Sequence, residues 1–372
     1  MGFPVVEPKL PVLDFSKETL KPGTKSWELA RKDVQRAFEE YGCFLVTYEA
    51  ISCELRNAMF GALEELFDLP TETKMKNKYE KPLNGYVGQN PVVPLHESLG
   101  IDNATAKEGI QSFTNLLWPV GNDRFSESAH SFAKLAAEID QIVTRMIFES
   151  YSLEKYYEAY IGSITYLLRL LKHNAPQGND PQLGFVAHTD KSFTTILHQN
   201  HVNALEVETK NGDWIKVELS PSSFVVFAGD ALMAWSNDRI VSPKHRVVVS
   251  GNEDRYSLAQ FSFGDGMVEV PEELVDEQHP LKYKPFNHLG FLGFFAENAY
   301  KRLECPIKAY CVHECNNMTV LNFAWLHAHS SVNIGPPVTH LFGLVSDPYF
   351  NRRATFVHTA RSVFSSSFAW AS

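Results

Sequence analysis

The chain has 372 residues, of which 44% are hydrophobic and 21% are charged, the ordinary usage of a folded globular protein. It carries 44 acidic and 34 basic residues, a formal net charge of −10, which makes a nucleic acid or an anionic membrane a poor partner. It shows no long apolar run, no signal-peptide pattern and only five cysteines, so we expect a soluble cytoplasmic protein without a disulfide framework.

The amino-terminal section alternates predicted strands and helices. Residues 10–15 and 43–47 read as short strands, because each is an apolar run that ends at turn or polar residues. Helices are expected from Thr24, a good N-cap residue, to about residue 41, and from about residue 53 to residue 67.

Residues 78–125 contain many Gly, Pro and Asn residues with little periodicity, so we expect loops and short strands there. Loops of this length often form lids over a substrate. A long helix is expected over residues 126–151, where apolar side chains recur at helical spacing. A last helical stretch is expected from residue 286 to about residue 303.

From residue 166 to residue 263 the pattern changes to short apolar segments at regular spacing. Strands are expected at residues 166–173, 184–189, 194–199, 204–208, 214–217, 223–228, 246–249 and 256–263. Eight short strands at this spacing are typical of two packed sheets. The sequence therefore predicts an α+β fold with a double-stranded β-helix core, the jelly-roll or cupin-like arrangement, flanked by helices.

His188, Asp190 and His245 have the spacing of a metal site. Side chains at i and i+2 of a strand leave the same face, so His188 and Asp190 can bind one ion while Thr189 points away. Two imidazoles and one carboxylate on one face of the metal leave positions open, as Fe(II) oxygen chemistry requires, whereas zinc usually closes its sphere differently. The other ring nitrogen of each histidine needs a partner that the sequence does not identify.

Several motifs together are specific for one family. They are Leu10-Pro-Val-Leu-Asp-Phe15, Tyr41-Gly-Cys-Phe-Leu45, His188-Thr-Asp190, Asn237-Asp-Arg-Ile240, His245-Arg246-Val247 and Arg255-Tyr-Ser257. With them, residues 8–311 resemble the plant 2-oxoglutarate and Fe(II)-dependent dioxygenase superfamily. Three stretches are most similar to the branch with the glucosinolate side-chain oxygenases and glycoalkaloid hydroxylases: Leu168-Arg-Leu-Leu-Lys172, His188-Thr-Asp-Lys-Ser192 and residues 224–230.

The resemblance implies an enzyme that hydroxylates or desaturates a plant specialised metabolite and forms succinate and CO2. It implies Fe(II), with 2-oxoglutarate and O2 as cosubstrates and ascorbate as reductant, and a monomer whose partner is a small-molecule substrate. His188, Asp190 and His245 would hold the iron, and no further catalytic residue is assigned.

The resemblance also implies that Arg255 pairs with the distal carboxylate of 2-oxoglutarate and that Ser257 donates a hydrogen bond to it. A guanidinium fork matches a carboxylate, and residues two apart on a strand share one face. Where the family commonly has a tyrosine that contacts the cosubstrate, this chain has His173, which we expect to be a cosubstrate contact that donates a hydrogen bond from its imidazole. An imidazole has less reach, so we expect weaker 2-oxoglutarate binding than a tyrosine would give.

Three alternatives remain open at the level of the sequence. One is an ascorbate-dependent iron oxidase that does not use 2-oxoglutarate and would form product without succinate. Another is a hormone oxidase acting on gibberellin or auxin, which would share the same core. The third is a non-catalytic small-molecule-binding jelly roll, which would have no need of Fe(II).

The remaining histidines and aromatic residues are assigned no function. His96, His198, His201 and His313 are read as solvated or core residues. Tyr86, Phe113, Trp118, Trp235 and Phe261 are read as core, although each is a candidate for lining a substrate pocket.

The domain organisation follows from these patterns. Residues 8–125 form an α-rich dioxygenase domain with substrate loops, and residues 126–311 form the jelly-roll catalytic domain with supporting helices. Residues 312–372 are an atypical extension outside the fold, rich in Ser, Phe, His and Ala and without helix or strand periodicity. This extension is either an artefact of the gene model or a true segment that covers the barrel mouth or docks a partner.

Overall fold

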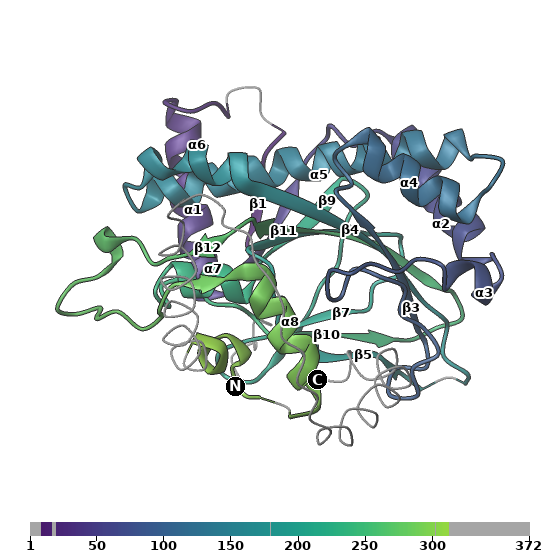
Figure 1. Cartoon of the computed structure of the whole chain (residues 1–372). Helices are drawn as coiled ribbons and strands as arrows, with labels where there is room; N and C mark the ends of the chain where they lie inside the picture. Colours follow the sequence, from purple (N-terminus) through teal and green to yellow (C-terminus); the bar gives the residue numbers. More distant parts are fainter. Residues whose placement is uncertain (1–8, 17–19, 179, 302, 312–372) are drawn as a thin grey trace, which may run out of the picture.

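Two β-sheets form the centre of the molecule (Figure 1), and residues of both sheets line a cavity. The structure, a computed structural model, describes residues 9–16, 20–178, 180–301 and 303–311. The larger sheet has the strand order β1 (Val12–Asp14), β2 (Cys43–Thr47), β9 (Ser223–Ala228), β6 (Thr194–Gln199), β11 (Arg255–Gly264), β4 (Ile164–His173) and β3 (His96–Asp102). The smaller sheet has the order β5 (Gln182–His188), β10 (His245–Val249), β7 (Leu205–Glu208) and β8 (Trp214–Lys216). A separate pair joins β12 (Met267–Val268) and β13 (Phe286–Asn287).

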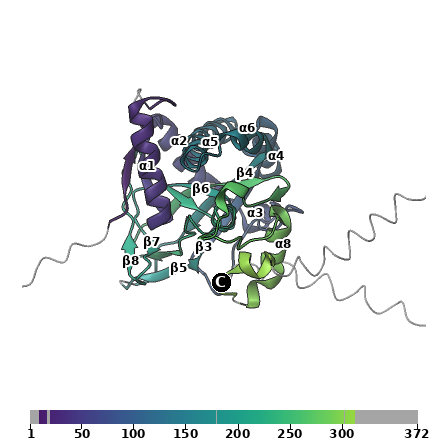
Figure 2. The same ribbon diagram turned by 90° about the vertical axis from the view of Figure 1, so that its left-hand side faces the viewer.

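Helices cover the outer face of the larger sheet (Figures 1 and 2). They are α1 (Lys25–Glu40), α2 (Cys53–Phe67), α4 (Lys107–Leu117), α5 (Asp123–Ser150) and α6 (Glu154–Ser163). The long helix α5 contacts α1, α2 and strand β6, and its apolar face belongs to the main core. The shorter elements are α3 (Thr71–Lys74), α7 (Asp230–Trp235), η1 (Glu272–Leu274), α8 (His288–Asn298) and η2 (Ala299–Lys301). No helix in the described part of the chain is long and apolar enough to cross a membrane.

Helix α1 shows how local sequence sets the element boundaries. The Thr24 hydroxyl accepts a hydrogen bond from the backbone N–H of Trp27 and so caps the first turn. After the helix, Gly42 has φ +71°, and a Cβ at this position would lie 2.3 Å from the carbonyl oxygen of Val241. Only glycine combines this conformation with this close approach, so the turn into β2 depends on it.

The predicted fold class is confirmed. All eight strands expected between residues 166 and 263 are present as β4 to β11, with ends shifted by at most two residues. The helices expected near residues 24–41, 53–67 and 126–151 are α1, α2 and α5.

The expectation of loops and short strands for residues 78–125 was only partly right, because this segment contains β3 and α4. Strand β3 pairs with β4, and both Leu99 and Ile101 on one face and Ser98 on the other are buried. A strand buried on both faces shows no alternation of polar and apolar residues, so its period is hidden in the sequence.

The proposed boundary at residue 125 remains a prediction. Strands β1, β2 and β3 of the amino-terminal section lie in the same sheet as β4, β6, β9 and β11. Residues 312–372, including His313 and the predicted extension, lie outside the described residues.

A buried carboxylate joins α5 to the larger sheet. Asp140 is 1% exposed and accepts hydrogen bonds from the hydroxyls of Thr194 and Tyr166, the latter at 2.8 Å. Burial raises the pKa of Asp140 to about 6, although these hydrogen bonds favour the charged form. The folded protein therefore binds the Asp140 proton more tightly than the unfolded chain does.

Asp140→Asn should change how stability depends on pH. In the wild type, the protonated Asp140 carboxyl contributes to the free energy of unfolding. This contribution is complete below pH about 4 and is lost as the pH rises through about 6. The free energy of unfolding of the wild type relative to the variant should therefore fall by up to about 3 kcal/mol between pH about 4 and about 7. Urea unfolding of both proteins across this range measures the difference, and parallel curves would contradict it.

Candidate active site

The cavity between the two sheets has an empty volume of about 1120 Å³, which includes open solvent at its mouth. Strands β3, β4, β6 and β11 of the larger sheet and β5, β7 and β10 of the smaller sheet line it. Among the described residues of its wall, Asp190 is the only carboxylate, whereas Arg169, Lys191 and Arg255 are cationic. The wall therefore favours negatively charged ligands.

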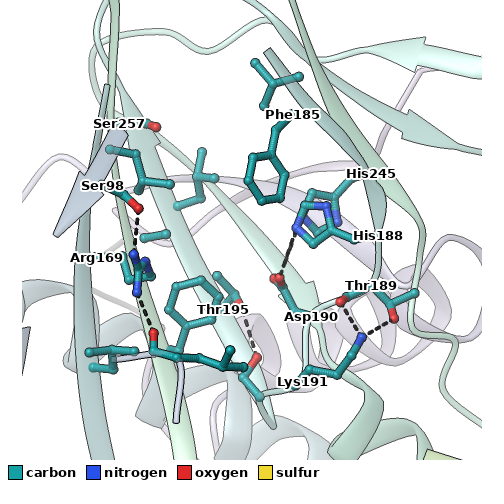
Figure 3. A pocket seen from close by; sticks show the side chains of 18 of the residues that line it. Ser98, Arg169, Phe185, His188, Thr189, Asp190, Lys191, Thr195, His245 and Ser257 are labelled. Atoms are coloured by element: carbon teal, nitrogen blue, oxygen red, sulfur yellow. Dashed lines mark hydrogen bonds and ion pairs between the residues drawn. The ribbon is translucent and has the colours of Figure 1, made fainter. Parts of the chain in front are cut away.

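His188, Asp190 and His245 meet on one side of this cavity (Figure 3). His188 is the last residue of β5 and His245 the first of β10, and the two are direct partners in the antiparallel pairing. The Nε2 atom of each imidazole lies 3.7 Å from Oδ1 of Asp190. The predicted triad is thus assembled, although Asp190 lies in the turn after β5 rather than on the strand itself.

The hydrogen bonds of the two imidazoles leave the correct nitrogen available for a metal. Nδ1 of His188 donates to the carbonyl oxygen of Val186 at 2.9 Å, and Nδ1 of His245 lies 3.4 Å from the carbonyl oxygen of Pro243. These are the partners that the sequence could not identify. Burial lowers the pKa of His188 to about 3, so its imidazole is neutral and its Nε2 lone pair is free to bind a cation.

The chemistry of this donor set fits Fe(II). Oδ2 of Asp190 is buried and has no hydrogen-bond partner among the described residues. A buried carboxylate oxygen without a partner is costly unless a cation compensates it. Two nitrogens and one carboxylate grouped on one side match the facial arrangement of non-haem iron oxygenases.

Asp230, which the sequence analysis did not single out, holds the turn that carries Asp190. Its backbone N–H donates to the carbonyl oxygen of Asp190 at 2.7 Å. Its carboxylate accepts from Thr189 Oγ1 at 3.1 Å and Ser242 Oγ at 2.7 Å and pairs with Lys191 Nζ at 2.9 Å. One carboxylate thus ties the turn after β5 to the segment that leads into His245.

Arg255 projects into the same cavity from β11 and is completely buried. Its Nε and Nη2 atoms donate to Oε1 of Gln199 at 3.1 and 2.8 Å, and Nη1 donates to Ser257 Oγ at 3.0 Å. Burial lowers the pKa of Arg255 to about 10, which still leaves the guanidinium charged at neutral pH. No ion pair joins it to an acidic side chain of the described residues. A buried cation with neutral partners is a site for an anionic ligand.

Other wall residues were placed differently from the expectation. His96 is buried, as the core reading expects, but it also lines the cavity and contacts His173. Arg169, which had no assigned role, donates to the carbonyl oxygens of Leu83 and Gly85 and so anchors the loop that contains them to β4.

The aromatic wall residues are Phe185, Phe261, Phe263 and Phe295. Of the five aromatic candidates, only Phe261 lines the cavity.

Comparison with known proteins shows the family to which the chain belongs. The family model of the 2OG-Fe(II) oxygenase superfamily matches residues 164–264, and the model for the non-haem dioxygenase in morphine synthesis N-terminal region matches residues 10–119. The chain is 43% identical over 315 residues to "Probable 2-oxoglutarate-dependent dioxygenase AOP1.2" of Arabidopsis thaliana, covering 82% of this chain and 97% of that protein. It is 32% identical over 403 aligned positions to the 2-oxoglutarate-dependent dioxygenase AOP3 of the same plant, with the same coverage.

A solved structure of a plant enzyme has a similar fold. The dioxygenase for auxin oxidation 1 from Arabidopsis thaliana, in a binary complex with 2-oxoglutarate, superposes with a TM-score of 0.65 and 27% sequence identity. The match covers 73% of this chain and 100% of that chain. Because curated relatives are matched along nearly their whole length, the chain belongs to the 2OG-Fe(II) oxygenase superfamily and is a 2-oxoglutarate-dependent dioxygenase, as its sequence motifs predict.

Proposed function

We propose that His188, Asp190 and His245 hold Fe(II), and that Arg255 and Ser257 bind the distal carboxylate of 2-oxoglutarate. The observation that carries this assignment is that the Arg255 guanidinium is buried in the wall of the triad's own cavity and that its partners there, within the described part of the chain, are all neutral groups. Ser257 Oγ accepts from Arg255, so its own hydroxyl hydrogen is available to a carboxylate.

The enzyme is proposed to hydroxylate or desaturate a small plant metabolite, and the auxin-oxidising relative makes auxin one compound to test. Bound Fe(II), together with 2-oxoglutarate and O2, supplies the oxidising chemistry, with succinate and CO2 as coproducts. The protein orients the substrate and excludes water with an apolar wall. That wall includes Leu167, Leu171, Leu197, Leu205, Ala259 and Leu292.

Further proposals concern the setting of the reaction. We propose ascorbate as the reductant that maintains Fe(II), a monomeric enzyme and a cytoplasmic location. The net charge of −10 gives no support for a nucleic acid or membrane partner.

Succinate formation tests the proposed function. The iron-loaded full-length protein and a form ending before Val312 would be incubated with 2-oxoglutarate and O2, with and without a plant metabolite extract, and in parallel with and without ascorbate. We expect extract-stimulated succinate. Product formed from ascorbate without succinate would contradict the role of 2-oxoglutarate, and activity confined to the shorter form would show that residues 312–372 inhibit the enzyme.

His173→Tyr should strengthen 2-oxoglutarate binding. A phenol reaches further than an imidazole. Its oxygen can still accept from Nη1 of Arg255, as Nδ1 of His173 does, while its hydroxyl hydrogen adds a donor to the carboxylate bound there. The dissociation constant for 2-oxoglutarate should fall about tenfold, the contribution of one hydrogen bond to a charged group. Anaerobic titration of both proteins at equal Fe(II) content measures this change, and an unchanged or larger constant would contradict it.

A further inference from the structure

A continuous chain of hydrogen bonds runs along the cavity wall away from Arg255. Nη1 of Arg255 lies 3.4 Å from Nδ1 of His173, and Nε2 of His173 lies 3.1 Å from Nδ1 of His96. Nε2 of His96 in turn lies 3.1 Å from Oγ of Ser98, which accepts from Arg169 at 2.6 Å. Ser98 and Arg169 lie across the cavity from the triad (Figure 3).

The two arginines determine the direction of this chain. A guanidinium can only donate, so Nδ1 of His173 must accept from Arg255 and its proton must lie on Nε2. That N–H then donates to Nδ1 of His96, whose own proton lies on Nε2 and is donated to Ser98. Burial lowers the pKa of His96 to about 3 and that of His173 well below its usual value, so both rings are neutral.

The backbone holds the three side chains in one row. His173 on β4 is the direct register partner of Arg255 on β11 and of His96 on β3. Directly opposed residues of neighbouring antiparallel strands have Cβ atoms about 5 Å apart and point to the same face. His96 and His173 are 4% and 1% exposed, so water does not compete for these contacts.

We infer that His173 and His96, here called the histidine pair, are positioning residues for Arg255 rather than donors to the cosubstrate. This inference rests on the proposed binding of 2-oxoglutarate at Arg255. Gln199 holds the Nε and Nη2 edge of the guanidinium, while Ser257 and His173 hold Nη1. His96 accepts a hydrogen bond from the only ring N–H of His173. This contact keeps the lone pair of His173 Nδ1 facing Arg255.

The predicted tautomers of the histidine pair can be tested without cosubstrate. In metal-free protein labelled with ¹⁵N-histidine, long-range ¹H–¹⁵N correlation spectra should show both rings with the proton on Nε2. Spectra of His96→Asn and His173→Asn assign the signals. A proton on Nδ1 of His173 would overturn the inference, because that N–H would face Arg255 and be able to donate to a bound carboxylate.

Two substitutions of His96 separate positioning from packing. His96→Leu removes the acceptor for the His173 N–H, whereas His96→Asn places an amide oxygen near the position of Nδ1. We expect His96→Leu to raise the dissociation constant for 2-oxoglutarate about tenfold, as for one lost hydrogen bond, and His96→Asn to stay within about threefold of the wild type. The KM for 2-oxoglutarate should change in parallel, and kcat at saturating 2-oxoglutarate should not.

The matched control is His198→Leu, which removes a buried histidine whose Nδ1 bonds the carbonyl oxygen of Ser223 and which does not line the cavity. It should leave 2-oxoglutarate binding unchanged. An equal loss of 2-oxoglutarate affinity in His96→Leu and His96→Asn would overturn the positioning role of the histidine pair. Unchanged affinity in both variants, with normal binding by the wild type, would overturn it as well. Neither result would contradict the proposed function. Failure of the wild type to bind 2-oxoglutarate would overturn the proposed function and this inference with it.

Discussion

Replacing His188 or His245 with alanine should abolish succinate formation and weaken Fe(II) binding more than about 100-fold. Each imidazole directs Nε2 at Asp190 from a neighbouring strand, so its loss leaves two of the three ligands. Loss of an outer-shell partner alone typically costs about 10- to 100-fold in metal affinity, and removal of a ligand costs more. Iron content after anaerobic loading and gel filtration measures binding, and succinate release measures activity.

The matched control for the triad is His201→Ala. His201 lies on the surface, where its Nε2 contacts Glu253, so this change removes an imidazole without touching the cavity. It should retain both iron and activity. Normal iron content in His188→Ala would show that the metal is held elsewhere in the molecule.

Arg255→Lys should weaken 2-oxoglutarate binding about 100-fold while leaving Fe(II) binding intact. Lysine keeps the positive charge but has no planar fork, so it cannot pair with a carboxylate through two N–H groups. It also cannot engage Gln199, Ser257 and His173 together, as the five N–H groups of Arg255 allow. The expected loss corresponds to about 2 to 3 kcal/mol, the contribution of charge-assisted hydrogen bonds in a buried site.

Equilibrium dialysis of 2-oxoglutarate against the anaerobic Fe(II) protein measures this effect. The control is Arg239→Lys, the same exchange at a partly buried arginine that bonds the carbonyl oxygen of Leu274 outside the cavity. It should bind 2-oxoglutarate as the wild type does. Wild-type affinity in Arg255→Lys would show that the cosubstrate carboxylate is bound by another group, with Arg169 the next cation to test.

Local patterns were sufficient for much of the fold and for selecting the residues that are proposed to carry the chemistry. Strand segments with a clear apolar run, such as residues 223–228, were located within one or two residues, because period and turn signals depend only on nearby side chains. The spacing of Arg255 and Ser257 likewise predicts a shared face from strand geometry alone, whereas His188 and Asp190 come together although Asp190 lies in the turn after β5. Strand β3 was not predicted, because burial on both faces removes the alternating pattern of polar and apolar residues.

The sequence by itself predicted which residues bind iron and a carboxylate, since this prediction depends on side-chain type and short spacing. Only the tertiary structure decided their partners: Gln199 beside Arg255, Asp230 behind the turn of Asp190, and His96 against His173. Each of these contacts joins residues at least 40 positions apart and exists because two strands or turns are paired in a particular register. The register of two strands that are far apart in the chain depends on the buried faces of both strands, so the pattern of one segment alone does not specify it.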